Sequence, residues 1–154
     1  MRSGLAWTLV VIQFVLIALL IAIPVGSLYP VGAGLTIASM VFVGAGIVLG
    51  MVAGARLGGS LTPSPIPKES GELATSGVYR LVRHPIYSAL LLVGLGLAIR
   101  GASVWHVIVL LALVGLLQVK ARAEEAMLLK KFHGYASFAA RVGRFIPGGG
   151  TIRD

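Results

Sequence analysis

The chain has 154 residues, of which 57% are hydrophobic and only 12% charged, and its mean hydropathy is +0.96. A soluble domain of this length cannot bury so much apolar surface, so the composition excludes that class and indicates a membrane protein. The absence of cysteine excludes disulfides, cysteine-ligated metals and a thiol nucleophile. The formal charge of +8 is not accompanied by interleaved aromatic residues on a soluble basic face, and we therefore predict no binding of nucleic acid.

The N-terminal third predicts two membrane-spanning helices. No formal charge occurs between Arg2 and Arg56, and about 20 apolar residues are enough to cross the hydrocarbon core. The first span is expected over residues 5–23, ended by Pro24, and its length favours a membrane helix over a secretory signal. The second is expected over residues 34–55. Its glycines recur at spacings of four, which indicates close helix packing: Gly46, Gly50 and Gly54.

A polar loop and a helical hairpin are predicted next. Three prolines between residues 63 and 67 favour an extended chain within the loop, which covers residues 56–85. Apolar residues resume over 86–99, break at Arg100 and Gly101, and continue over 102–119. The expected fold is therefore all-α and polytopic, with about four transmembrane helices. A single membrane-embedded domain would cover residues 1–154, with residues 120–154 forming a cytoplasmic helix and tail.

The basic residues predict the orientation in the membrane. Twelve of the 13 Lys and Arg residues, with all five acids, fall in the N-terminus, the long loop and the tail, whereas Arg100 falls on the opposite side. Because cytoplasmic segments retain basic residues, we expect both termini to be cytoplasmic, as in a bacterial multi-pass membrane protein. The same distribution favours contact with anionic lipid headgroups.

Two clusters carry the chemistry. In the first, Pro85 suits the first position of a helix and places His84 at its cap, where free backbone N–H groups attract anions. Arg83 adds positive charge, and Tyr79 and Tyr87 supply aromatic faces with hydroxyl groups. An interfacial anchor is an equal alternative for this segment alone.

The second cluster follows the fourth span, where Glu124 and Glu125 are adjacent carboxylates at the membrane edge. They are suited to a cationic ligand, although pairing of Glu125 with Arg122 on one helix face would also explain them. Aromatic residues follow, and the tail is expected to lie along the membrane or to fold over the loop. No metal site is predicted.

Together these residues resemble the integral membrane methyltransferases typified by isoprenylcysteine carboxyl methyltransferase, to which phospholipid N-methyltransferases are related. The resemblance covers residues 59–147. It rests on the approach at 75–79, the Arg-His-Pro-Ile-Tyr run at 83–87, the double Glu, and the aromatic tail of Phe132, Tyr135 and Phe138 before residues 144–147.

The resemblance implies S-adenosylmethionine as methyl donor and a lipophilic acceptor that arrives from the bilayer. The acceptor atom, whether O, S or N, stays open, as does the oligomeric state. Arg83 and Glu125 are the implied catalytic residues. The implied donor-binding residues are Tyr79, His84, Pro85, Tyr87, Gly94, Gly96, Glu124 and Glu125. For Gly94 and Gly96, helix packing is an equal alternative.

The sequence is also compatible with two other classes of membrane protein. A sterol-reductase-like enzyme would use NADPH, but the chain is short for the many spans of that family. A non-enzymatic membrane subunit or small transporter is the other alternative, although no acid inside the predicted spans marks an ion path.

Overall fold

The computed structural model describes residues 3–60, 62, 64, 66 and 73–150, and within these residues the fold is all-helical. Four long helices form the bundle, and short helices flank them: α1 (Ser3–Ala22), α2 (Ala33–Leu57), η1 (Gly58–Ser60), η2 (Gly77–Arg80), α3 (Pro85–Gly101), α4 (Val104–Lys131) and α5 (Tyr135–Arg141). The predicted all-α polytopic fold is confirmed, and the helix ends of the first three spans lie within two residues of those expected.

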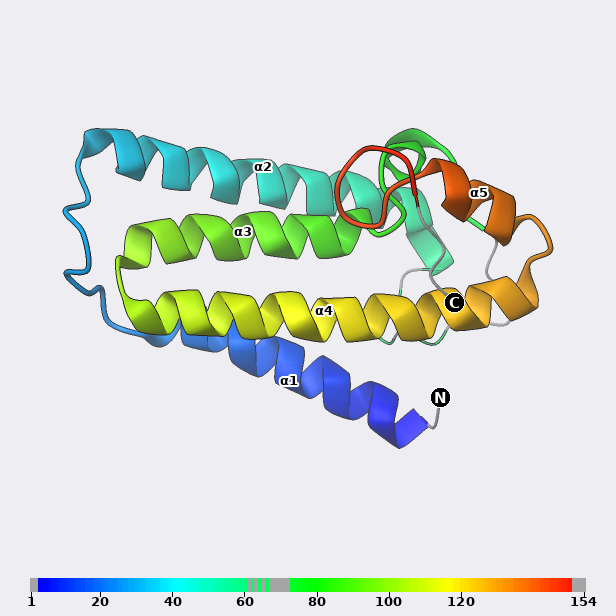
Figure 1. The fold of residues 1–154 in the computed structure, drawn as a ribbon, viewed down its shortest axis with the longest axis horizontal. Helices are drawn as coiled ribbons and strands as arrows, with labels where there is room; N and C mark the ends of the chain where they lie inside the picture. The colour runs from blue at the N-terminus through cyan, green and yellow to red at the C-terminus, as the bar shows by residue number, and fades with distance from the viewer. Residues whose placement is uncertain (1–2, 61, 63, 65, 67–72, 151–154) are drawn as a thin grey trace.

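Three of the helices are long and apolar enough to cross a membrane: α1, α2 and α4. Their outer surfaces carry large exposed apolar side chains, including Trp7, Met40 and Leu111, which suits contact with lipid. The fourth helix, α3, has 17 residues, or roughly 25 Å of rise. It lies between α2 and α4 (Figure 1), so its neighbours shield it from most of the lipid.

Helices α2 and α3 pack through small residues. A Cβ atom added at Gly46 would meet Ala89 O at 2.7 Å, and one added at Gly96 would meet Ser39 O at 2.7 Å. The backbones are close enough for Ser39 Oγ to donate a hydrogen bond to Gly96 O at 2.9 Å. The glycine stripe of α2 is thus a packing surface at Gly46, as predicted.

The hairpin between α3 and α4 turns at Ala102, which adopts a left-handed φ of 43°. Ser103 then caps α4 by accepting a hydrogen bond from the N–H of Trp105 at 3.2 Å. The chain after α1 is held to this turn, because the N–H groups of Gly26 and Leu28 donate to Gly101 O and Ala102 O, each at 2.8 Å. Arg100 lies at this end of the bundle.

The opposite end of the bundle gathers the start of α1, the segment after residue 73 and α5 (Figure 1). Here the tail folds over the loop, one of the two arrangements expected. The N–H groups of Arg83 and His84 donate to Gly143 O and Arg144 O, at 2.8 and 3.1 Å, and Ser88 Oγ donates to Phe145 O at 2.7 Å. The tail therefore fixes the start of α3.

Candidate active site

A cavity of about 500 Å³ lies at this end of the bundle, between α1, α3, α4 and the tail. Its volume is in the range of sites for small organic ligands. Predicted site residues line it together with aromatic residues of the tail: Tyr79, Arg83, His84, Pro85, Tyr87, Glu124, Phe132, Tyr135 and Phe138. The antiparallel hairpin thus brings the Arg-His-Pro run and the first carboxylate of the double Glu to one ligand-sized space.

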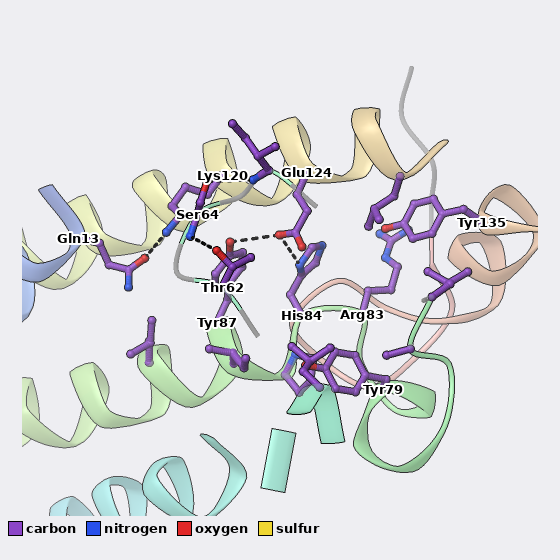
Figure 2. Close-up of a pocket in the computed structure, with 18 of the residues that line it drawn as sticks. Gln13, Thr62, Ser64, Tyr79, Arg83, His84, Tyr87, Lys120, Glu124 and Tyr135 are labelled. Carbon is purple, nitrogen blue, oxygen red and sulfur yellow. Dashed lines mark hydrogen bonds and ion pairs between the residues drawn. The ribbon is translucent and has the colours of Figure 1, made fainter. Parts of the chain in front are cut away.

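His84 connects the two carboxylates. Its Nδ1 atom lies 3.5 Å from Glu124 Oε2, and its Nε2 atom lies 3.1 Å from Glu125 Oε1. Tyr87 donates its hydroxyl hydrogen bond to Glu124 Oε2 at 3.2 Å, and its ring stacks on the His84 ring with centroids 5.2 Å apart. Figure 2 shows Glu124 and His84 pointing toward each other inside the cavity.

Glu125 faces away from the cavity and holds the tail. It accepts two hydrogen bonds from Arg144, at 3.0 and 2.7 Å, and lies 3.4 Å from Arg83 Nε. The alternative pairing with Arg122 is not what the structure shows, because Arg122 is exposed and Glu125 is buried against cations from two other segments. These hydrogen bonds raise the pKa of Arg144 above its ordinary value.

The side chain of Arg83 is held in one position by its contacts. Its side chain is buried, and Nη1 donates to Ala139 O of α5 at 3.0 Å. One guanidinium therefore contacts Glu125, α5 and the cavity wall, and it contributes positive charge at a defined position.

Two tyrosines keep neutral hydroxyl groups at the cavity. Burial, with the charge of Glu124 as a smaller cause, raises the pKa of Tyr79, and burial raises the pKa of Tyr135 above its usual range. Tyr79 Oη donates to Ala53 O at 3.4 Å. Tyr135 Oη is buried and has no hydrogen-bond partner among the described residues. A buried hydroxyl of this kind is costly unless something else binds it, so Tyr135 marks a position for a polar ligand atom.

Gly94 and Gly96 do not line the cavity. A Cβ at Gly94 would meet Leu110 at 3.1 Å, and Gly96 packs against α2. Their surroundings favour the helix-packing alternative. Glu125 also does not line the cavity, and it is the only charged residue among the predicted site residues of which this is true. It acts on the cavity through its contacts with His84 and Arg83.

Residues that sequence reasoning did not assign to a site also line the cavity, among them Gln13 and Lys120. Gln13 is a polar residue within an apolar span, and Lys120 ends another apolar run. Polar residues at such positions are the signal that points to function in a membrane helix.

The bundle and its cavity define a helical membrane protein with a ligand-sized cavity, lined by polar and aromatic residues, at one end. The sequence model of the phospholipid methyltransferase family matches residues 34–134. The chain therefore belongs to this family of integral membrane methyltransferases, to which the isoprenylcysteine carboxyl methyltransferases are related. No curated protein matches the chain with significance.

Membership of this family favours a methyltransferase over the sterol-reductase-like enzyme and the non-enzymatic subunit. The matched segment contains α2, α3 and α4 and ends at Gly134. Helix α1 and the tail after Gly134, both of which contribute cavity residues, fall outside it.

Proposed function

We propose that this membrane methyltransferase uses S-adenosylmethionine as methyl donor and methylates a lipophilic acceptor at the cytoplasmic face of the membrane. The observation that carries the proposal is the pairing of His84 with Glu124 in the lining of a cavity that Tyr135 also lines, its hydroxyl having no hydrogen-bond partner in the described part of the chain. The donor supplies a methyl group on a positively charged sulfur.

The chemistry of the lining fits such a donor. Glu124 is the carboxylate suited to a cationic group, because Glu125 is already neutralised by Arg144 and Arg83. Arg83 and the first turn of α3 suit a carboxylate, since N–H groups at a helix start have no intrahelical acceptor. The apolar and aromatic walls suit a heteroaromatic base, with Leu128, Phe132 and Phe138 among them.

The residues act mainly by positioning. Methyl transfer from a sulfonium needs alignment and exclusion of water rather than a catalytic nucleophile. Arg144 and Glu125 hold the tail over the cavity, and His84 keeps Glu124 oriented. We assign Glu125 to positioning and Glu124 to direct contact with the donor, which refines the roles expected from the sequence.

Helix α1 provides the route by which a lipophilic acceptor would reach the cavity. Phe14 and Ile17 of α1 form part of the cavity wall, and in Figure 1 α1 diverges from α4 toward its N-terminus. This arrangement suits access for a lipophile from the bilayer. Exposed basic side chains at the same end suit anionic lipid headgroups: Arg56, Arg80, Arg122, Lys130, Lys131 and Arg141.

Calorimetric titration tests the donor. S-adenosylmethionine and its demethylated product are titrated into detergent-purified wild type, Glu124→Gln and the control Arg122→Gln, whose side chain is exposed on the same helix. A charged hydrogen bond is worth about 1.5 to 3 kcal/mol, so Glu124→Gln should bind about tenfold to a hundredfold more weakly. The control should bind as the wild type does. Absence of binding to the wild type, or unchanged affinity in Glu124→Gln, would refute the proposal.

Labelled methyl transfer into membrane extracts tests the acceptor. We expect label in the lipid-soluble fraction, dependent on the enzyme. Label confined to water-soluble molecules would contradict a lipophilic acceptor.

A further inference from the structure

A second, smaller groove lies where the C-terminal end of α2 meets η2. It has a volume of about 350 Å³ and is lined by residues of these two elements: Val52, Ala55, Arg56, Gly77 and Val78. None of these residues lines the cavity of the candidate active site. The groove is therefore a separate feature of this end of the bundle.

The groove lies at the expected boundary of the membrane. Helix α2 is long and apolar enough to cross the bilayer, and Arg56 is in its last turn. On the preceding turns, Val48, Met51 and Val52 are exposed apolar side chains suited to contact with lipid. Because Val52 also lines the groove, the apolar surface of the span continues to a cation at its end. Such a combination is typical of the layer where acyl chains meet headgroups.

The guanidinium of Arg56 is held across the groove. Its Nη2 atom donates to Ser76 Oγ at 2.6 Å, and Ser76 directly precedes η2. Its Nε atom lies beside Gly77, where an added Cβ atom would be 3.6 Å away. The side chain thereby links the end of α2 to the start of η2 and gives the groove a positive charge at a defined position.

The positive charge of Arg56 has no ion-pair partner in the described part of the chain. The acids there are Glu124 and Glu125, and both contact basic groups of the candidate active site instead. The planar fork of an arginine matches two oxygens of a phosphate, and Ser76 uses one nitrogen atom of this fork. A phosphate is therefore the anion that best complements the groove.

We propose that this groove binds an anionic phospholipid of the membrane, with its phosphate on Arg56 and an acyl chain along Val52 and Met51. This is a defined site, in addition to the general attraction of a basic surface for headgroups. A zwitterionic phospholipid carries an ammonium group as well, and no carboxylate lines the groove to receive it. The groove should therefore prefer a phospholipid with a net negative headgroup. The site is independent of the methyl donor and acceptor proposed above.

A lipid in the groove would brace η2 against α2. Gly77 and Val78 line the groove, whereas Tyr79, the next residue of the same turn, lines the active-site cavity and donates to Ala53 O of α2 at 3.4 Å. The turn therefore separates the lipid from the cavity, and the lipid adds a second attachment between η2 and α2. Because a ligand of the folded form stabilises it, bound lipid should reduce local opening of the turn that places Tyr79 in the cavity wall.

Native mass spectrometry measures the lipid preference. Phosphatidylglycerol and phosphatidylcholine with identical acyl chains are titrated separately into delipidated, detergent-purified protein. We expect the wild type to bind phosphatidylglycerol about tenfold more tightly, which is the effect of one charge-assisted hydrogen bond. Arg56→Met should lose this preference. Arg122→Met, which removes the same charge from an exposed position on α4, should keep it.

A groove-filling variant covers any effect of Arg56→Met on folding. Val52→Trp fills the groove from an exposed position and leaves Arg56 in place, so the protein should fold and should lose the preference for phosphatidylglycerol. Val48→Trp, an exposed change one turn earlier and outside the groove lining, should keep it. The site is overturned by equal binding of the two lipids to the wild type, by a preference retained in either groove variant, or by a loss that Arg122→Met shares with Arg56→Met.

Hydrogen exchange of η2 tests the brace. In nanodiscs, the amides of residues 77–80 should exchange more slowly in phosphatidylglycerol than in phosphatidylcholine for the wild type, and equally in the two lipids for Val52→Trp. The first half of α4, toward the other end of the bundle, is the internal reference. Identical exchange of wild-type η2 in the two lipids would overturn the brace. Neither measurement uses the methyl donor, so neither depends on the proposed function.

Discussion

Nε2 of His84 lies 3.1 Å from Oε1 of Glu125, although 41 positions separate the two residues. Glu125 is at the same time bound by Arg144 through two hydrogen bonds. The start of α3, the end of α4 and the tail thus meet at one buried carboxylate. Glu125 itself does not line the cavity, so it acts on the site through its contacts with His84 and Arg83, which do.

The junction predicts that Arg144→Met loosens the tail. The variant removes two charged hydrogen bonds to Glu125 and one to Gln118, so we expect the tail to lose about 1.5 to 3 kcal/mol of local stability. Hydrogen exchange by mass spectrometry should show faster exchange in α5 with little change in the first half of α4. Arg141→Met, an exposed change in α5, is the control. Equal exchange in the two variants would contradict a clamp at Arg144.

Tyr135→Phe should weaken donor binding while leaving the protein stable at neutral pH. Its hydroxyl has no hydrogen-bond partner among the described residues, so removal costs the fold little. A lost hydrogen bond to the donor should reduce affinity about twofold to tenfold in calorimetry. Tyr29→Phe removes a hydroxyl that donates to Ile99 O at 2.9 Å at the far end of the bundle, and it should show the reverse pattern. Unchanged donor affinity in Tyr135→Phe would separate this hydroxyl from the site.

The same variant predicts a pH effect on stability. Burial raises the folded-state pKa of Tyr135 above its ordinary value of 10.0. A tyrosine that must stay neutral when folded destabilises the fold only above its unfolded pKa, so stability should be unaffected below pH 10 and should fall as pH rises beyond it. Melting temperatures from pH 8 to 11 should fall less steeply in Tyr135→Phe than in wild type. Parallel curves for the two proteins would argue against a buried neutral phenol.

Gly96→Ala should destabilise the bundle without a specific effect on the donor. The new methyl group would meet Ser39 O and Val43 Cγ2 at 2.7 Å, so α2 and α3 would have to separate. Such overpacking costs about 1 to 3 kcal/mol, measurable as a lower melting temperature. Gly115→Ala, where a Cβ meets nothing within 4 Å, should be neutral or stabilising. Weaker donor binding at unchanged stability in Gly96→Ala would instead indicate a cofactor contact.

Single cysteines test the orientation, because the chain contains none of its own. Thr75 is exposed just before η2, and Val104 is exposed at the start of α4, at the opposite end of the bundle. In intact cells, a membrane-impermeant maleimide should modify Val104→Cys from outside and should reach Thr75→Cys only after permeabilisation. The reverse pattern would overturn the orientation predicted from the basic residues.

Much of the architecture follows from local sequence signals. The uncharged stretch between Arg2 and Arg56 predicts two spans, and the break at Arg100 and Gly101 predicts the hairpin. Pro85 after His84 predicts where α3 begins. These signals depend on hydropathy and backbone preference over a few residues, and they are therefore readable without knowledge of the packing. The antiparallel hairpin then requires His84 and the double Glu to share one end.

Tertiary structure alone decides which groups meet at that end. In the sequence, Glu124 and Glu125 are equivalent, and Arg122 is a possible ion-pair partner for Glu125. In the structure, the tail packs so that Arg144 pairs with Glu125, whereas Glu124 lines the cavity. The contact between Gln13 and Lys120 joins residues 107 positions apart. Such contacts depend on how the helices rotate and cross, which is set by side-chain packing across the whole bundle rather than by any local pattern.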